Sequence, residues 1–120
     1  MKFKVPDKLK NVIKNTLTKI AETKDSKIRK GMNETTKSIE RGVAKLVIIA
    51  EDVSPPEIVY HLPLLCEEKG VPYGYVSSKK ELGNAVKIGV AAAAVAIENV
   101  GTGNESELEK IIKDLESLKK

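Results

Sequence analysis

Hydrophobic residues recur at helical spacing near both ends of the chain, with charged and polar residues between them. Near the start these residues are Leu9, Val12, Ile13, Leu17 and Ile20. Near the end they are Leu108, Ile111, Ile112, Leu115 and Leu118. The spacing predicts amphipathic helices over residues 7–22 and from about Asn104 onwards.

Apolar segments between these two helices predict the strands of a sheet. Residues 46–50 form an unbroken apolar run, which is typical of a central strand covered on both faces. Residues 28–30, 71–76 and 90–97 are expected to form the other strands. The last of these is rich in alanine, which would let a helix approach it closely.

Start and stop signals predict three further helices. The first should cover residues 32–41 and end at Gly42. A later, short helix is opened by a capping box in which Ser78 caps the helix and Glu81 stands three residues on.

The third of these helices has the most complete start signal. Ser54 fits the cap, Pro55 the first helical position and Glu57 the end of a capping box. Pro63 is expected to break or kink this helix, and Gly70 to end it.

The alternation of helices and strands predicts one α/β domain, a three-layer α/β/α sandwich around a small mixed sheet. A chain of 120 residues suffices for one domain with a modest core. No glycine-rich phosphate loop follows a predicted strand, so the fold implies no nucleotide cofactor and no enzyme by itself.

Positive charge is concentrated in the first part of the chain. Residues 1–45 hold 13 Lys and Arg against 5 Asp and Glu, a net charge of +8. Residues 46–120 hold 8 against 12, a net charge of −4. A localised basic region attracts a polyanion, whereas the alternative is a set of solvated helix faces that happen to carry lysines.

Several classes of protein are disfavoured by composition. The single cysteine, Cys66, excludes an internal disulfide and fits a reducing compartment. The first residues lack the apolar core of a signal peptide, and the longest mostly apolar run, residues 89–97, is far below the ~20 residues of a membrane span. A cytoplasmic protein without membrane association is expected.

The segment from Lys30 to Lys37 holds the main candidate for binding chemistry. Gly31, Asn33 and Glu34 stand at the predicted helix start, with Lys37 and Arg41 on the following turns. Lysines and open backbone N–H groups attract phosphate, which a carboxylate repels. Glu34 therefore fits a nucleic-acid surface only if it accepts hydrogen bonds from bases.

Structural readings of the same residues remain open. Asn33 is also a favoured capping residue, and Lys37 and Arg41 could pair with acids one turn away, as Glu34 stands three residues before Lys37.

Lys79 and Lys80 add a second basic point. A lysine at a helix start opposes the helix dipole, so a phosphate there would relieve the conflict. Aromatic residues are few, which argues for structured RNA over stacked single strands.

Candidate catalytic and metal-binding residues have simpler structural explanations. His61 and Cys66 are five residues apart, a spacing that does not place them on one helical face, and two ligands are too few for a metal site. No partner is evident to orient them as a nucleophilic pair. Glu51 and Asp52 could form a carboxylate pair at a strand end, but Asp52 also fits the dipole of the helix after Ser54. Local structural roles are expected for all four, with no cofactor or metal.

Motifs spread over nearly the whole chain agree with one another in their order. They are Lys30-Gly31, Asn33-Glu34, Thr36-Lys37 and Glu40-Arg41-Gly42, then residues 49–53, 61–69 and 71–73, and finally Ser78-Lys79 and Leu82-Gly83. In these motifs the chain resembles the kink-turn-binding ribosomal protein seven-Ae family, and is most similar to its archaeal members.

The resemblance implies an α/β/α sandwich that clamps a kink-turn, a sharply bent RNA motif with tandem sheared G·A pairs. Asn33, Glu34 and Lys37 would read exposed guanine edges, while Gly31 would allow close backbone approach. The other implied contacts are Ile58 with a flipped-out nucleotide, Lys79 with phosphate, and the apolar loop Ile88-Gly89-Val90 with the extruded base.

The resemblance also implies partners. They are ribosomal RNA of the large subunit, box C/D and H/ACA guide RNAs and ribonuclease P RNA, together with other ribosomal or guide-particle proteins. The free protein is expected to be a monomer.

One segment departs from the family pattern. The family often shows Gly-hydrophobic-x-x-Pro in the apolar loop, where this chain reads Lys87-Ile88-Gly89-Val90-Ala91. The missing proline and glycine affect the rigidity of the loop, and Lys87 would add a phosphate contact. Met32 also replaces a smaller residue beside Gly31.

Three alternatives remain at this point. One is a ribosomal protein of the same superfamily that binds a different RNA element. Another is a small enzyme that uses Glu51, Asp52 or Cys66 in a cleft. The third is a protein-interaction module that uses the helix over residues 55–69.

Overall fold

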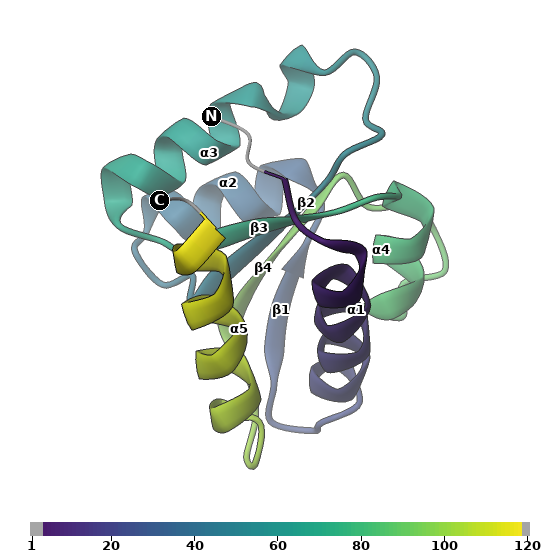
Figure 1. Ribbon diagram of the computed structural model, residues 1–120, viewed down its shortest axis with the longest axis vertical. Helices are drawn as coiled ribbons and strands as arrows, with labels where there is room; N and C mark the ends of the chain where they lie inside the picture. The colour runs from purple at the N-terminus through teal and green to yellow at the C-terminus, as the bar shows by residue number, and fades with distance from the viewer. Residues whose placement is uncertain (1–3, 119–120) are drawn as a thin grey trace.

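The computed structural model describes residues 4–118, apart from the side chain of Ile58. Helices and strands alternate along this part of the chain (Figure 1). In order they are α1 (Asp7–Ala21), β1 (Lys27–Lys30), α2 (Met32–Glu40), β2 (Leu46–Ala50), α3 (Glu57–Lys69), β3 (Tyr73–Val76), α4 (Lys79–Ala85), β4 (Ala94–Asn99) and α5 (Glu105–Leu118).

The four strands form one mixed sheet in the order β1-β4-β2-β3. Strands β2 and β3 are parallel, whereas β4 runs antiparallel to both β1 and β2. The carboxyl ends of β1, β2 and β3 therefore meet the amino end of β4 at one side of the sheet. We call this side the carboxyl edge, and it comprises residues 30–31, 50–52, 76–79 and 92–94.

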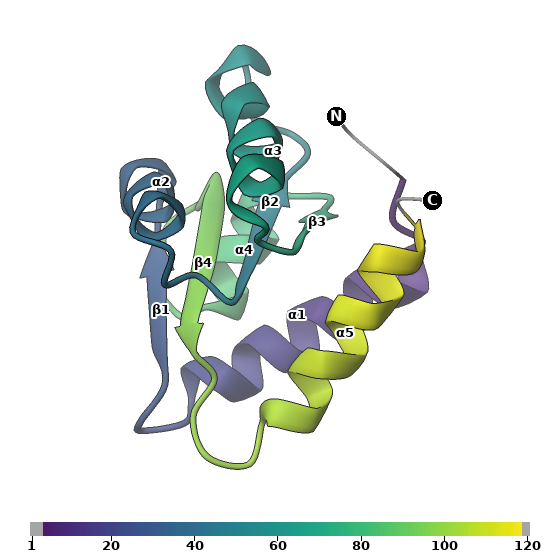
Figure 2. The same ribbon diagram turned by 90° about the vertical axis from the view of Figure 1, so that its left-hand side faces the viewer.

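Helices cover both faces of the sheet, which confirms the predicted three-layer sandwich. Helices α2 and α3 lie on one face and α1, α4 and α5 on the other (Figure 2). All five residues of β2 are buried, as their continuous apolar run predicted. No helix within the described residues has the length and apolar character needed to cross a membrane.

The predicted start of α3 is wrong. Ser54 does not cap this helix, which begins at Glu57 with Pro56 in the cap position and no side-chain cap hydrogen bond. A residue that precedes proline disfavours helical dihedrals, so Pro56 keeps Pro55 out of the helix. Pro63 lies buried within α3 and does not break it, because the helix continues to Lys69.

The predicted start of β4 is also wrong, since the strand begins at Ala94 and not at Val90. Lys87 and Gly89 have positive φ angles of 64° and 74°, which turn the chain away from an extended conformation. Residues 86–93 form a loop instead, and we call it the apolar loop.

Glu98 on β4 is a largely buried acid that forms ion pairs with two basic residues of β1. Its carboxylate lies 3.2 Å from Arg29 Nε and 3.7 Å from Lys27 Nζ. Burial alone would raise the pKa of Glu98, but the Ser38 hydroxyl, the hydrogen bond and charge of Arg29 and the charge of Lys27 outweigh burial and lower it.

Glu98→Gln is expected to destabilise the fold at neutral pH by about 1–2 kcal/mol, because a charged hydrogen bond is lost. The pKa is lowered in the folded state, so this contribution is present above the ordinary carboxyl pKa and disappears as the pH falls through the folded-state value. Thermal unfolding of both proteins on acidification should show the Tm difference shrinking. A difference that does not change with pH would refute this account of Glu98.

Candidate nucleic-acid interface

Helix α2 begins at the carboxyl edge without a capping side chain. Gly31 occupies the cap position with φ 110° and ψ 165°, and no side chain caps the helix. The Gly31 N–H donates to Ala94 O at 2.9 Å, and its carbonyl accepts from Thr35 N at 3.0 Å. The first N–H groups of a helix have no intrahelical partner, so this helix start is open to an acceptor from outside.

The Glu34 carboxylate lies over Gly31. A Cβ built on Gly31 would be 3.0 Å from Glu34 Oε1, so glycine leaves room for this arrangement. Glu34 is exposed, and none of the ion pairs among residues 4–118 joins it to Lys37. The alternative of a simple helical ion pair is therefore not observed.

Asn33 is not the cap either, because that place belongs to Gly31. Asn33, Lys37 and Arg41 are exposed at four-residue intervals, so they follow one another along one face of α2. Lys30 is exposed at the end of β1, just before the helix. In the described part of the chain none of these cations forms an ion pair.

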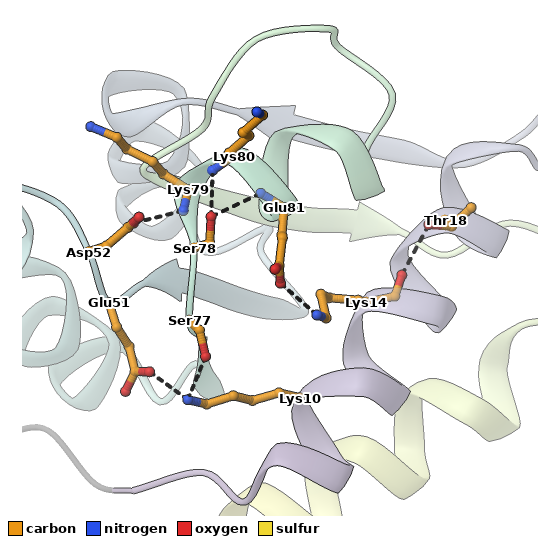
Figure 3. Close-up of polar contacts among 10 residues, drawn as sticks. All are labelled: Lys10, Lys14, Thr18, Glu51, Asp52, Ser77, Ser78, Lys79, Lys80 and Glu81. Carbon is orange, nitrogen blue, oxygen red and sulfur yellow. Dashed lines mark hydrogen bonds and ion pairs between the residues drawn. The ribbon is translucent and has the colours of Figure 1, made fainter.

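Helix α4 differs from α2 because its start is occupied from within the protein (Figure 3). The Asp52 carboxylate accepts from Lys79 N at 2.7 Å. Ser78 Oγ accepts from Lys80 N at 3.1 Å and from Glu81 N at 3.3 Å. Asp52 thus already supplies negative charge at this helix start. The phosphate contact of the Lys79 side chain stays a prediction.

The Ser78 cap itself is confirmed, whereas within the described residues the Glu81 side chain does not bond back to Ser78 to complete the predicted capping box. Its carboxylate instead accepts from Lys14 Nζ at 2.6 Å, which joins α4 to α1 (Figure 3). The exposed side chains of Lys79 and Lys80 remain as the cationic groups at this point.

The apolar loop returns to the sheet through two backbone hydrogen bonds. Ala92 N donates to Lys79 O at 2.9 Å, and Ala50 N donates to Ala93 O at 2.9 Å. The side chain of Val90 is 66% exposed, while Ile88 is half-buried against the core. The loop thus presents Val90 and the exposed Gly89 to solvent at the carboxyl edge.

Lys87 lies apart from this apolar surface. Its Nζ is 3.0 Å from Glu22 Oε2 at the end of α1, and both side chains are at least half exposed. An exposed pair of this kind contributes little to stability, so it restrains Lys87 only weakly.

Gly83 has a packing role in this region that was not predicted from the sequence. A Cβ at Gly83 would lie 1.8 Å from Val90 O, so the backbone of the apolar loop rests directly on α4. The available signal was a glycine inside a predicted helix, where it has a cost unless close packing requires it.

The structure thus brings together most of the predicted site. Backbone hydrogen bonds join Gly31 to Ala94, Ala93 to Ala50 and Ala92 to Lys79, so the α2 start, the apolar loop and the α4 start meet at the carboxyl edge. The side chain of Ile58 lies outside what the structure describes.

Comparison with known proteins identifies the family. The ribosomal protein L7Ae/L30e/S12e/Gadd45 family matches residues 11–106. The chain belongs to this family. Among solved structures it is similar to the Giardia lamblia 15.5kD RNA binding protein, with 37% sequence identity, a TM-score of 0.87, and coverage of 95% of this chain and 92% of that chain.

RNA-binding proteins of the L7Ae family are non-catalytic, and in this member the candidate catalytic residues have local partners. Lys10 Nζ lies 2.6 Å from Glu51 Oε1 and 2.9 Å from Ser77 Oγ (Figure 3). Cys66 is buried. Asp52 has a local structural role as expected, but it accepts from the Lys79 N–H at the start of α4 and does not serve the helix that follows it in the sequence.

His61 is also held locally in this L7Ae-family chain. Its Nε2 is 3.3 Å from Thr36 Oγ1, which links α3 to α2. Within residues 4–118, no three His, Cys, Asp or Glu side chains gather into a group that could hold a metal.

Proposed function

We propose that this chain is an RNA-binding protein that recognises a kink-turn and stabilises its bent form. The observation that carries the proposal is the open start of α2, where an exposed carboxylate stands close in sequence to cations that form no ion pair within residues 4–118. The family supports RNA as the ligand, and the similar Giardia protein is named as an RNA-binding protein.

Different groups of the protein recognise the RNA backbone and the RNA bases. Lys30, Lys37 and Arg41 and the open N–H groups of α2 attract phosphate, which fixes the position of the RNA. Glu34 is repelled by phosphate but accepts hydrogen bonds from the amino and imino groups of guanine. With Asn33, it reads guanine edges that sheared G·A pairs leave exposed.

The other side of the carboxyl edge holds the kinked part of the RNA. Lys79 binds a backbone phosphate, and the apolar loop at Ile88, Gly89 and Val90 packs against the extruded base. Lys87 adds a phosphate contact by exchanging its weak pairing with Glu22, and Ile58 lies against the flipped-out nucleotide. Because these contacts need the bent RNA, binding shifts the RNA towards that form.

The RNAs that carry this motif define the cellular role. We propose ribosomal RNA of the large subunit, box C/D and H/ACA guide RNAs and ribonuclease P RNA as ligands, with the other proteins of those particles as partners. The free chain acts as a monomer.

A gel-shift comparison of a kink-turn RNA with an unkinked duplex of equal length and charge tests the proposal. The kink-turn is expected to bind at least about a hundredfold more tightly, as for other specific nucleic-acid complexes. Equal affinity for the two RNAs would refute kink-turn recognition and favour the alternative of a different RNA element.

Lys79→Ala is expected to weaken binding of all RNAs by a similar factor, because a phosphate contact carries no sequence information. The slope of log affinity against log salt concentration should fall by about one unit. Lys113→Ala is a matched control, since Lys113 is an exposed lysine on α5, outside the residues that make up the carboxyl edge. An unchanged slope for Lys79→Ala would exclude the phosphate contact.

A further inference from the structure

The backbone of Lys79 joins three segments of the carboxyl edge. Its N–H donates to Asp52 Oδ1 at 2.7 Å, and its carbonyl accepts from Ala92 N at 2.9 Å. Asp52 lies two residues after β2, Lys79 starts α4 and Ala92 lies near the end of the apolar loop. A single carboxylate thus connects the end of a buried strand to both of the other segments through the backbone of one residue, Lys79.

The segment that carries Asp52 is itself held in place. Glu51 N donates to Val76 O at 2.9 Å, which extends the pairing of β2 with β3. The Glu51 carboxylate is 2.6 Å from Lys10 Nζ, and the Lys10 and Glu51 side chains are only 12% and 20% exposed. The Asp52 side chain therefore extends from an anchored segment of the backbone towards the start of α4 (Figure 3).

Asp52 has two opposite effects on an RNA that approaches Lys79. Its hydrogen bond fixes the backbone of Lys79. This backbone carries the Lys79 side chain and accepts the hydrogen bond from Ala92 in the apolar loop. The negative charge of Asp52, close to the same backbone, repels phosphate. The two effects can be separated, because asparagine keeps the accepting oxygen without the charge and alanine removes both.

We propose that Asp52 is a positioning residue for RNA binding, which acts through the Lys79 N–H and not through contact with RNA. This inference rests on the proposed function, since it assigns the RNA-binding surface to the carboxyl edge. The hydrogen bond of Asp52 favours RNA binding because it holds Lys79 in place, whereas the negative charge of Asp52 opposes RNA binding.

Asp25 offers a matched control at the opposite edge of the sheet. Its carboxylate accepts from Thr102 N at 3.1 and 3.2 Å and from Thr102 Oγ1 at 2.7 Å. Asp25→Ala therefore removes the same charge and a similar backbone hydrogen bond, away from the α2 start. Any effect shared by the two alanine variants comes from net charge or general stability.

The first measurement needs no RNA. Hydrogen exchange of the Lys79 amide is expected to accelerate in Asp52→Ala and to stay slow in Asp52→Asn, while Asp25→Ala leaves it unchanged. Equal exchange rates in wild type and Asp52→Ala would overturn the positioning role, whatever the protein binds.

The second measurement is the affinity for kink-turn RNA and for an unkinked duplex. Asp52→Ala should bind kink-turn RNA about tenfold more weakly, because Lys79 and the end of the apolar loop must then be ordered on binding. Asp52→Asn should bind as tightly as wild type or more tightly, and Asp25→Ala should bind like wild type. The loss caused by Lys79→Ala should become smaller in the Asp52→Ala background, because the lysine is then no longer held in place.

The outcomes distinguish this inference from the proposed function. A wild-type protein that binds both RNAs equally refutes kink-turn recognition, while the exchange measurement still decides the role of Asp52. A wild type that prefers the kink-turn, with Asp52→Ala equally tight, or with Asp52→Asn as weak as Asp52→Ala, overturns the inference alone.

Discussion

Gly83→Ala is expected to weaken kink-turn binding by roughly 10- to 100-fold, the effect of losing about 1–3 kcal/mol of apolar contact between the loop and an extruded base. The added Cβ would lie 1.8 Å from Val90 O, and no side-chain rotation can relieve a clash with a carbonyl of the backbone. The apolar loop must therefore move away from α4. Overpacking should also cost about 1–3 kcal/mol of stability.

Gly74→Ala separates the two effects of this substitution. A Cβ at Gly74 would lie 2.7 Å from Leu115 Cδ2, so it also overpacks the protein, but between β3 and α5. It is expected to lower the Tm without changing RNA affinity measured well below that Tm. If Gly83→Ala bound as tightly as wild type, the apolar loop would have no part in recognition.

Glu34→Ala is expected to cost roughly 1–3 kcal/mol in kink-turn binding, because guanine then loses its hydrogen-bond acceptor. Affinity for an unkinked duplex should stay equal or increase, since a negative charge has been removed from a basic surface. Titration of wild type and variant with both RNAs measures this opposite response.

Glu40→Ala is the control for net charge. Glu40 is an exposed acid at the end of the same helix, beyond the first turn. Its removal should change both RNA affinities by the same small factor. A Glu34→Ala variant that behaved like Glu40→Ala would show that Glu34 acts only through its charge.

Much of the fold could be predicted because the deciding signals are local. The five-residue apolar run of β2 and the helical spacing of α1 and α5 each specify their own element. The same S-x-x-E pattern occurs at Ser54 and Ser78, but only Ser78 caps a helix. The difference is the pair of prolines after Ser54, since the second excludes the first from helical geometry.

The candidate site was predictable only in part, because several of its contacts join residues that are far apart in the sequence. Glycine before an Asn-Glu pair is visible in the sequence, and the structure places it at an uncapped helix start. Asp52 was assigned to the wrong helix because its partner, Lys79, lies 27 residues away. The role of Gly83 depends on the backbone of Val90, and a glycine inside a predicted helix indicates close packing without identifying the partner.

The most direct test of base reading is a cycle that combines Glu34→Ala with inosine in place of each sheared-pair guanine, one position at a time. Inosine lacks the exocyclic amino group that a carboxylate would accept from. At one position, inosine should weaken wild-type binding by about tenfold and have little further effect on Glu34→Ala. Fully additive losses at every position would contradict the account, because Glu34 would then not contact the guanine amino group.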